Sequence, residues 1–159
     1  TAGRRGRGPR ALLYRLGRTW RRRRRERDDR PVLLHLGDAR SRAAVATLAP
    51  WSRVAAEGPA AALVLGGGAV LDAVTFETVR SVDAPRLERM VLGASAGSGP
   101  VADWADFLGT CLSVAMATEA DAAAVRSWGY AGIISVVGHP ADDREPADSA
   151  LAALREEVS

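Results

Sequence analysis

The first residues that could bind a ligand stand directly after an apolar run at 32–36. They are Gly37, Asp38 and Arg40, and a helical pattern begins at the same point. Backbone amides at a helix start and a guanidinium could hold an anionic group, while Asp38 could accept a hydrogen bond from a hydroxyl. The alternative is that Asp38 only caps the helix.

Two further segments could contribute to the same substrate-binding site. Gly66, Gly67 and Gly68 follow a second apolar run, and three successive glycines let the backbone come close to a ligand. They match neither the dinucleotide-binding pattern nor a phosphate-binding loop, so a plain tight turn is the alternative. His139 ends a later apolar run and could carry a proton near neutral pH, unless it is only a solvent-facing loop residue. His35 lies within the first run, which predicts a core histidine.

Ser95 is a candidate nucleophile for a different chemistry. It is the centre of Gly-Ala-Ser-Ala-Gly at 93–97, which matches the G-x-S-x-G pattern of hydrolases. The earlier glycines at 66–68 could supply oxyanion amides, and the pairing resembles that of patatin-like lipases. A serine needs a base to become a nucleophile, and no Asp-Gly dyad partner follows it. Ser95 and His139 are therefore the two catalytic candidates, and the catalytic residue itself is left open.

Alternating apolar runs and helical patterns must position these residues. Apolar runs without polar alternation predict strands buried on both faces, and we expect strands at 32–36, 61–65, 75–82, 112–117 and 133–138. We expect helices at 39–57 with a kink at Pro50, and at 69–74, 85–92, 104–108, 118–129 and 148–157, with a loop at 94–100. This order predicts an α/β, Rossmann-like fold with a mostly parallel sheet and helices on both faces. Ligands bind such sheets at the carboxyl ends of the strands.

The charge divides the chain into two parts at Pro31. Residues 1–30 hold 13 arginines and three carboxylates, whereas residues 31–159 hold nine arginines and 16 carboxylates. The sequence therefore predicts an Arg-rich arm at 1–30 that is followed by an acidic Rossmann-like domain at 31–159.

The arm contains the pattern of a basic amphipathic helix, with its apolar residues on one face. The residues predicted to contact a membrane are Leu12, Leu13, Leu16, Trp20, Arg21 and Arg22. Such a helix is typical of proteins that lie on an anionic membrane surface. The arm could instead be a linker or pack on the acidic domain. Nucleic acid is the least favoured partner, because the arm has only two aromatic residues for base stacking.

The composition limits the other classes of function. No run approaches the roughly 18 apolar residues of a membrane-spanning helix. The single cysteine, Cys111, excludes an internal disulfide, and only two histidines accompany it. We therefore expect neither a metal site nor a cofactor.

A family resemblance covers most of the domain. The stretch Leu-Ser-Val-Ala-Met-Ala-Thr-Glu-Ala-Asp at 112–121, with Trp-Gly-Tyr at 128–130 and Val-Val-Gly-His-Pro at 136–140, is similar to the close of the N-terminal half of GT-B glycosyltransferases. The opening Arg-Pro-Val-Leu-Leu-His-Leu-Gly-Asp-Ala-Arg at 30–40 and Ala-Pro-Trp at 49–51 resemble actinobacterial CDP-glycerol glycerophosphotransferase-like enzymes of wall teichoic acid synthesis. The resemblance extends over about residues 31–142, although residues 93–100 lack the His-Gly loop of those enzymes.

The resemblance implies the acceptor-side half of a glycosyl- or glycerophosphotransferase. The acceptor would be a membrane-associated glycan or polyol-phosphate polymer of the cell envelope, and a C-terminal half beyond residue 159 would bind the donor. The protein would then be cytoplasmic and peripheral on the inner face of the membrane. A non-catalytic binding or scaffold module with the same fold is the alternative, and a serine hydrolase that uses Ser95 is a further one.

Overall fold

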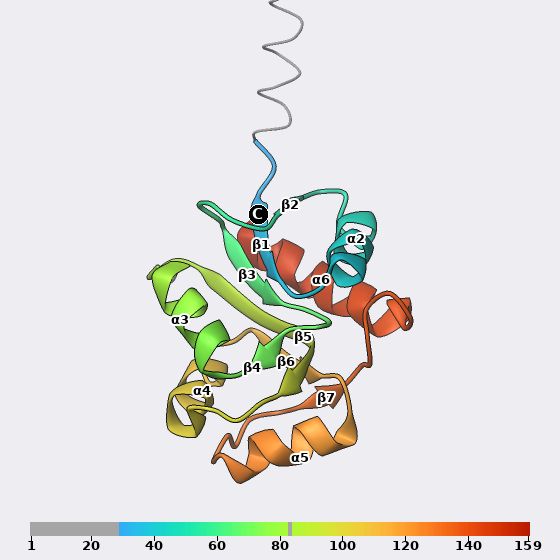
Figure 1. Ribbon diagram of the computed structural model, residues 1–159. Coiled ribbons are helices and arrows are strands. Elements are labelled where there is room, and N and C mark those ends of the chain that lie inside the picture. The colour runs from blue at the N-terminus through green and yellow to red at the C-terminus, as the bar shows by residue number, and fades with distance from the viewer. Residues whose placement is uncertain (1–28, 83) are drawn as a thin grey trace, which may run out of the picture. The chain divides into compact units, whose positions relative to one another are not determined.

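The computed structural model describes residues 29–82 and 84–159, and the folded unit that they form begins at Pro31 (Figure 1). The predicted amphipathic helix and all six membrane-binding candidates lie outside the described residues. Among the described residues, no helix is long and apolar enough to span a bilayer.

The described residues contain one seven-stranded sheet in which every pairing is parallel. Its strands are β1 (Val32–Leu36), β2 (Arg53–Ala55), β3 (Ala62–Leu65), β4 (Val70–Leu71), β5 (Glu88–Ala96), β6 (Ser113–Met116) and β7 (Ser135–Val136). Their order is β2-β1-β3-β5-β6-β7, and β4 pairs with the end of β5. This topology confirms the predicted α/β, Rossmann-like fold.

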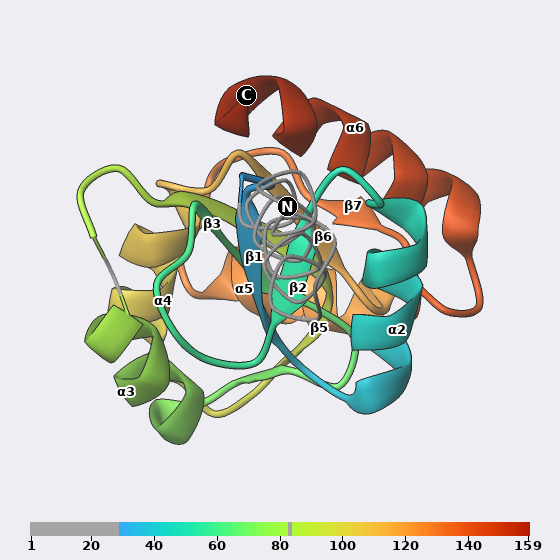
Figure 2. The same cartoon turned by 90° about the horizontal axis from the view of Figure 1, so that it is seen from above.

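Helices cover both faces of the sheet, as the uninterrupted apolar runs predict. One face packs against α2 (Ala39–Leu48) and α6 (Arg144–Val158), and the other packs against α3 (Ala73–Val82), α4 (Val101–Leu108) and α5 (Glu119–Ser127). Figure 2 shows α2 and α6 on the opposite side of the sheet from α3 and α4. Successive residues of β1 illustrate the two cores, because Leu33 packs toward α2 and α6 while Leu34 packs toward the other helices. Each fully buried leucine contributes about 1.5–3 kcal/mol to stability.

A side-chain cap marks the start of α5. The Thr118 hydroxyl accepts a hydrogen bond from Asp121 N, which makes Thr118 the N-cap. Asp121 Oδ1 also accepts a hydrogen bond of 3.0 Å from Ala96 N. The capping carboxylate thus fastens the helix to the end of β5, a tertiary contact that the local pattern does not contain.

The predictions between residues 69 and 96 were wrong. Residues 75–82 belong to helix α3 instead of a strand, residues 70–71 form β4 instead of a helix, and residues 88–96 form β5 instead of a helix and a loop. Asp72 starts α3 by accepting a hydrogen bond of 2.8 Å from Thr75 N. A short apolar run fits the residue spacing of a helix and that of a strand equally well. Here the burial of β5 between two helical layers decides that the run is a strand.

Three boundaries also differ from the sequence prediction. Helix α2 ends at Leu48 instead of continuing to residue 57, because residues 53–55 pair with β1 as β2. Helix α6 begins at Arg144, four residues earlier than predicted. Only residues 135–136 of the expected strand 133–138 are paired, and Ile133 is 88% exposed instead of buried. The errors at β2 and β7 lie at the two edges of the sheet, where pairing partners and not local pattern set the limits.

The sheet has its crevice between β1 and β3. The chain leaves β1 toward the face that carries α2, and it leaves β3 toward the face that carries α3. Two neighbouring parallel strands whose connections depart to opposite faces leave a crevice at their carboxyl ends, where ligands of such sheets bind. The segments that follow β1 and β3 are those singled out from the sequence, 37–40 and 66–68.

Candidate functional site

Asp38 lies at the carboxyl edge of the sheet, between the end of β1 and the start of α2. Its extended backbone and its Oδ1, which accepts a hydrogen bond of 2.7 Å from Ser41 N, make it the N-cap of α2. The capping interpretation is therefore confirmed, but the carboxylate does more. Both of its oxygens lie 3.0 Å from His139 Nε2, and the side chain keeps 44% of its surface exposed. Asp38 can accept a further hydrogen bond from a ligand.

His139 reaches this place because the segment after β7 crosses the carboxyl edge of the sheet. Val137 N donates to Met116 O of β6, and a Cβ on Gly93 of β5 would lie 2.6 Å from Gly138 O. His139 Nδ1 accepts a hydrogen bond of 3.1 Å from Ala141 N, which assigns the ring proton of the neutral tautomer to Nε2. Both ring nitrogens of His139 are thus hydrogen-bonded within the protein. In the Asp38–His139 pair, the group that remains free to accept a hydrogen bond is the Asp38 carboxylate.

The hydrogen bonds around Asp38 keep it ionised. Burial by itself would raise the pKa of Asp38, but the hydrogen bonds from Ser41 N and from His139 outweigh it and lower the pKa below its ordinary value of 3.8. A carboxylate stabilised in this way accepts a hydrogen bond from a hydroxyl across the physiological pH range.

The glycine segment 66–68 packs directly against these side chains. A Cβ on Gly67 would lie 2.5 Å from His139 Cδ2, and a Cβ on Gly68, whose φ is +84°, would lie 2.7 Å from Asp38 Oδ2. Asp38 N also donates to Gly67 O at 2.8 Å. The glycine backbone therefore comes close to the protein's own acid and imidazole, and its approach to a ligand stays a prediction.

A second, buried layer lies beneath this pair. His35 is 1% exposed, which confirms it as a core histidine, and its Nε2 lies 2.8 Å from Ser41 Oγ. The same hydroxyl accepts a hydrogen bond of 2.9 Å from Gly67 N. Burial, reinforced by the nearby Arg42, lowers the pKa of His35 from 6.5 to about 4, so the ring is neutral at physiological pH.

Sequence reasoning did not identify Ser41, although the sequence contains a signal for it. Ser41 shares the buried face of α2 with Ala44 and Val45. A polar residue on the apolar face of a helix requires a hydrogen-bonding partner, because burial of an unpaired hydroxyl is costly. The partners, His35 and Gly67, come from β1 and from the segment after β3, so only the fold could identify them.

Arg40 belongs to the rim of the site. Its Nη2 forms an ion pair of 2.6 Å with Asp142 Oδ1, and both side chains are 64% exposed. An exposed pair of this kind contributes little to stability, from zero to about 1 kcal/mol. The ion pair links the loop after His139 to the start of α2, in addition to the link between His139 and Asp38.

Ser95 lies away from this cluster, inside β5. It is paired with Val70 of β4, and Ser95 N donates to Ala69 O at 2.9 Å. It therefore stands in an extended strand and not at a sharp turn between a strand and a helix. Gly66 N donates to Leu36 O, and Gly67 N donates to Ser41 Oγ, so these amides already have acceptors. No hydrogen bond in the described part of the chain joins the Ser95 hydroxyl to a histidine or a carboxylate.

The site thus combines an exposed, ionised acceptor with an imidazole that holds it in place, at the usual ligand-binding edge of a parallel sheet. In residues 29–82 and 84–159, no three metal-ligating side chains gather as a metal site would require. No protein-family model matches the chain, and no curated protein and no solved structure matches it.

Proposed function

We propose that residues 31–159 bind the hydroxyl-bearing acceptor of a glycosyl- or glycerophosphotransferase, with Asp38 as the residue that receives the hydroxyl. The acceptor is a glycan or polyol-phosphate polymer associated with the membrane of the cell envelope. One observation carries the proposal: the segments after β1, β3 and β7 converge on an exposed Asp38 that is held by His139 at 3.0 Å. The resemblance of the sequence to the N-terminal half of GT-B transferases supports the same assignment.

The arrangement provides a simple route for the proton. The acceptor hydroxyl donates its hydrogen bond to the free side of the Asp38 carboxylate, which turns a lone pair of the oxygen toward the donor. As that oxygen forms its bond to the transferred group, the bond to the leaving nucleotide breaks and the hydroxyl proton passes to Asp38. His139 Nε2–H keeps the carboxylate oriented throughout. General-base assistance of this type accelerates reactions by about 10²–10⁴-fold. In this proposal the donor is bound by a second half of the enzyme.

The first test is acceptor binding to the isotope-labelled chain, followed by NMR. We expect poly(glycerol phosphate) to shift the amide signals of Asp38, Gly67 and Gly68, and we expect CDP-glycerol to leave them unchanged. Asp38→Asn should weaken binding of the polymer at least tenfold. Asparagine caps a helix about as well as aspartate, so this variant keeps α2 intact.

The matched control is Asp142→Asn, which removes a carboxylate from the rim without touching the Asp38–His139 pair. We expect it to bind the polymer as the unmodified chain does. Equal affinities of the Asp38→Asn and Asp142→Asn variants would overturn the proposal, as would the absence of any shift at Asp38. No observation in the described residues favours the scaffold or the hydrolase alternative.

Attachment to the membrane is the second part of the proposal, and the sequence of the arm supports it. With 13 arginines against three carboxylates in residues 1–30, the arm should bind anionic but not neutral vesicles. Cosedimentation should weaken with added salt. It should also weaken in the variants Leu13→Glu and Trp20→Glu, which charge the predicted apolar face. Equal binding to neutral and anionic vesicles would remove this part of the proposal.

A further inference from the structure

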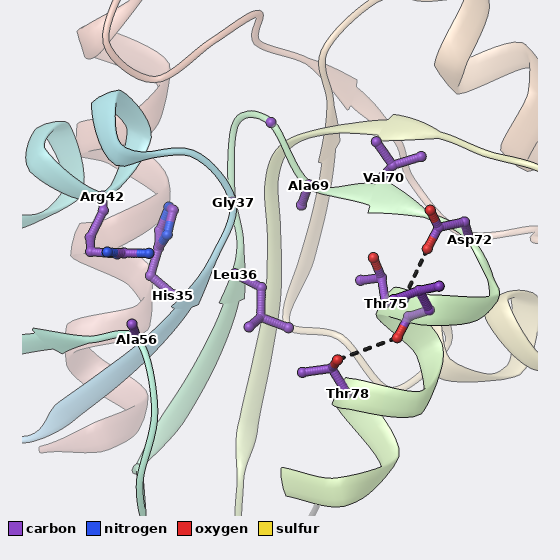
Figure 3. Close-up of a pocket in the computed structure, with 12 residues that line it drawn as sticks. His35, Leu36, Gly37, Arg42, Ala56, Ala69, Val70, Asp72, Thr75 and Thr78 are labelled. Atoms are coloured by element: carbon purple, nitrogen blue, oxygen red, sulfur yellow. Dashed lines mark hydrogen bonds between the residues drawn. The ribbon is translucent and has the colours of Figure 1, made fainter.

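A pocket of about 390 Å³ opens beside Asp38, between the carboxyl end of β1 and helix α3. Figure 3 shows His35 and Arg42 on one side of it and Asp72, Thr75 and Thr78 on the opposite side. Gly37, which precedes Asp38 in the sequence, and Gly68, on which a Cβ would lie 2.7 Å from Asp38 Oδ2, also line it. The pocket therefore lies next to Asp38, although Asp38 itself is not one of its lining residues.

The hydrogen bonds of His35 favour one tautomer of its ring. Ser41 Oγ accepts a hydrogen bond from Gly67 N and lies 2.8 Å from His35 Nε2, and a hydroxyl that accepts from one partner can donate its single hydrogen to the other. Because Nε2 then acts as the acceptor, the proton of the neutral ring is on Nδ1. The Nε2–Cδ2 edge of the ring faces Gly66, which leaves Nδ1 on the other edge. This Nδ1 is buried and has no hydrogen-bonding partner.

Arg42 presents a second unpaired donor on the same side of the pocket. Its Nε is buried without a partner, and no carboxylate of the described residues forms an ion pair with its guanidinium. A buried donor without an acceptor costs about 1–3 kcal/mol, and more when it is charged. Native structures leave very few such groups unpaired, and each one requires an explanation. Here two of them belong to residues that line one pocket, the 99%-buried His35 and its neighbour Arg42.

We propose that this pocket binds a phosphate group, whose oxygens accept hydrogen bonds from the Arg42 guanidinium and from His35 Nδ1–H. A phosphate fits because its several oxygens can accept from a guanidinium fork and from an imidazole at the same time. Neither Nδ1 nor Nε has accessible surface in the structure, so the Arg42 side chain turns as the phosphate enters.

The opposite side of the pocket sets the orientation of the ligand. The Asp72 carboxylate is ionised, because hydrogen bonds from Thr75 lower its pKa below 3.8, and it repels an anionic group. Asp72 and the Thr75 hydroxyl instead suit the hydroxyls of a polyol. The inference deepens the proposed function, on which it rests for the nature of the ligand. A polyol phosphate places its phosphate at Arg42 and His35, and a hydroxyl at Asp38.

The test is a titration of the full chain, labelled with nitrogen-15, with inorganic phosphate, glycerol 3-phosphate and glycerol. The readout is the side-chain nitrogen spectrum of His35. We expect the free protein to carry its ring proton on Nδ1, and we expect both phosphates but not glycerol to shift that nitrogen. A bound phosphate should also raise the pKa of His35 from about 4, since it supplies negative charge beside the ring where Arg42, Asp38 and His139 now act.

Variants of Arg42 test the site without replacing the buried histidine. Arg42→Gln should lower the affinity for glycerol 3-phosphate at least tenfold, and Arg42→Lys should lower it less. The matched control is Arg126→Gln, on an exposed position at the end of α5, which should bind as the unmodified chain does. Urea denaturation of each variant checks that it is folded. Equal affinities of the Arg42→Gln and Arg126→Gln variants, or an unchanged His35 signal, would overturn the inference.

The same titrations separate this inference from the proposed function. If glycerol 3-phosphate binds in an Arg42-dependent manner while Asp38→Asn has no effect, the phosphate site stands and the acceptor proposal fails. If Asp38→Asn weakens binding and Arg42→Gln does not, the acceptor proposal stands and the phosphate site fails. Vesicles of anionic phospholipid form a last arm. A His35 shift that occurs with vesicles but not with glycerol 3-phosphate would assign the phosphate to a lipid headgroup and overturn the polyol assignment.

Discussion

Two glycine-rich segments of similar composition have different uses in this fold. At 66–68, the positions of absent Cβ atoms are taken by polar side chains, those of His35, Asp38 and His139. At 93–97, they are taken by backbone: a Cβ on Gly93 would lie 2.6 Å from Gly138 O, and one on Gly97 would lie 2.7 Å from Leu71 O. The first segment lets titratable groups pack at the carboxyl edge of the sheet. The second lets two neighbouring segments, β4 and the chain after β7, pack closely against the end of β5.

The difference shows what a glycine-rich motif can establish. Gly-Ala-Ser-Ala-Gly matches a catalytic pattern in its letters, yet Gly97 makes room for β4 beside β5 and Gly93 makes room for the segment after β7. The glycine triplet at 66–68 matches no catalytic pattern, yet it packs directly against Asp38 and His139 of the candidate site. Because a glycine only removes volume, its function depends on what occupies the space, and that is a property of the tertiary structure.

The largest loss of stability should come from removing the hydroxyl of Ser41, which contacts the first segment. Removing the hydroxyl of Ser95, in the second segment, should have little effect. Ser41→Ala leaves His35 Nε2 and Gly67 N without their partner, at about 1–3 kcal/mol for each buried group. Ser95→Ala removes a hydroxyl that bonds to no histidine or carboxylate in the described residues, and it should change stability by less than about 0.5 kcal/mol. Urea denaturation of both variants measures the contrast, and similar losses would contradict the division between the two segments.

The pH dependence of stability should also originate at the first segment. The pKa of His35 falls from 6.5 in the unfolded chain to about 4 in the fold. The unfolded state therefore binds the proton first, and stability is lost as the pH falls from 6.5 to about 4, by up to about 3 kcal/mol. The hydrogen-bonded carboxylates Asp38 and Asp72 have pKa values below 3.8, so they act only at lower pH.

Urea denaturation at intervals between pH 7 and pH 4 measures this loss, and NMR titration of the His35 ring identifies its origin. A His35 ring that titrates near 6.5 in the folded protein would contradict the prediction. Equal stability at both ends of the interval would contradict it as well.

Alanine substitutions of the glycines themselves sharpen the comparison. Gly97→Ala forces a Cβ against the backbone of β4, which cannot move away, so it should cost about 1–3 kcal/mol. Gly67→Ala meets the ring of His139, a side chain that can turn outward, so its cost should be smaller. The second variant should nevertheless abolish the Asp38–His139 contact, which the His139 nitrogen spectrum reports. The opposite order of stabilities would show that the loop around His139 is rigid.

The smallest effect should come from the rim of the site. Arg40→Gln breaks an ion pair whose side chains are both 64% exposed, and it should change the free energy of unfolding by less than about 1 kcal/mol. Denaturation in low and high salt checks this, since the small difference should vanish at high salt. A larger loss would mean that the Arg40–Asp142 link holds the loop after β7 in place.

The accuracy of the sequence prediction varies along the chain for physical reasons. The unit of β6 and α5 was predicted well, because Thr118 and Asp121 define the helix start within four residues. The stretch 69–96 was predicted poorly, because its apolar spacing suits a helix and a strand alike. Phe76 belongs to a helix because its ring packs edge-on against that of Trp104, with the ring centroids 5.2 Å apart. The residues around Phe76 in the sequence do not predict that contact.

The sequence by itself determined the class of fold, the apolar runs buried on both faces of the sheet and the position of Asp38 at the start of a helix. These follow from periodicity and capping, which act over a few residues. Only the tertiary structure decided that Asp38 meets His139, 101 residues away, and that Ser41 bridges His35 and Gly67. Such pairs depend on the order of the strands and on which segment crosses the edge of the sheet. Strand order is the result of packing across the entire domain, and no short stretch of residues encodes it.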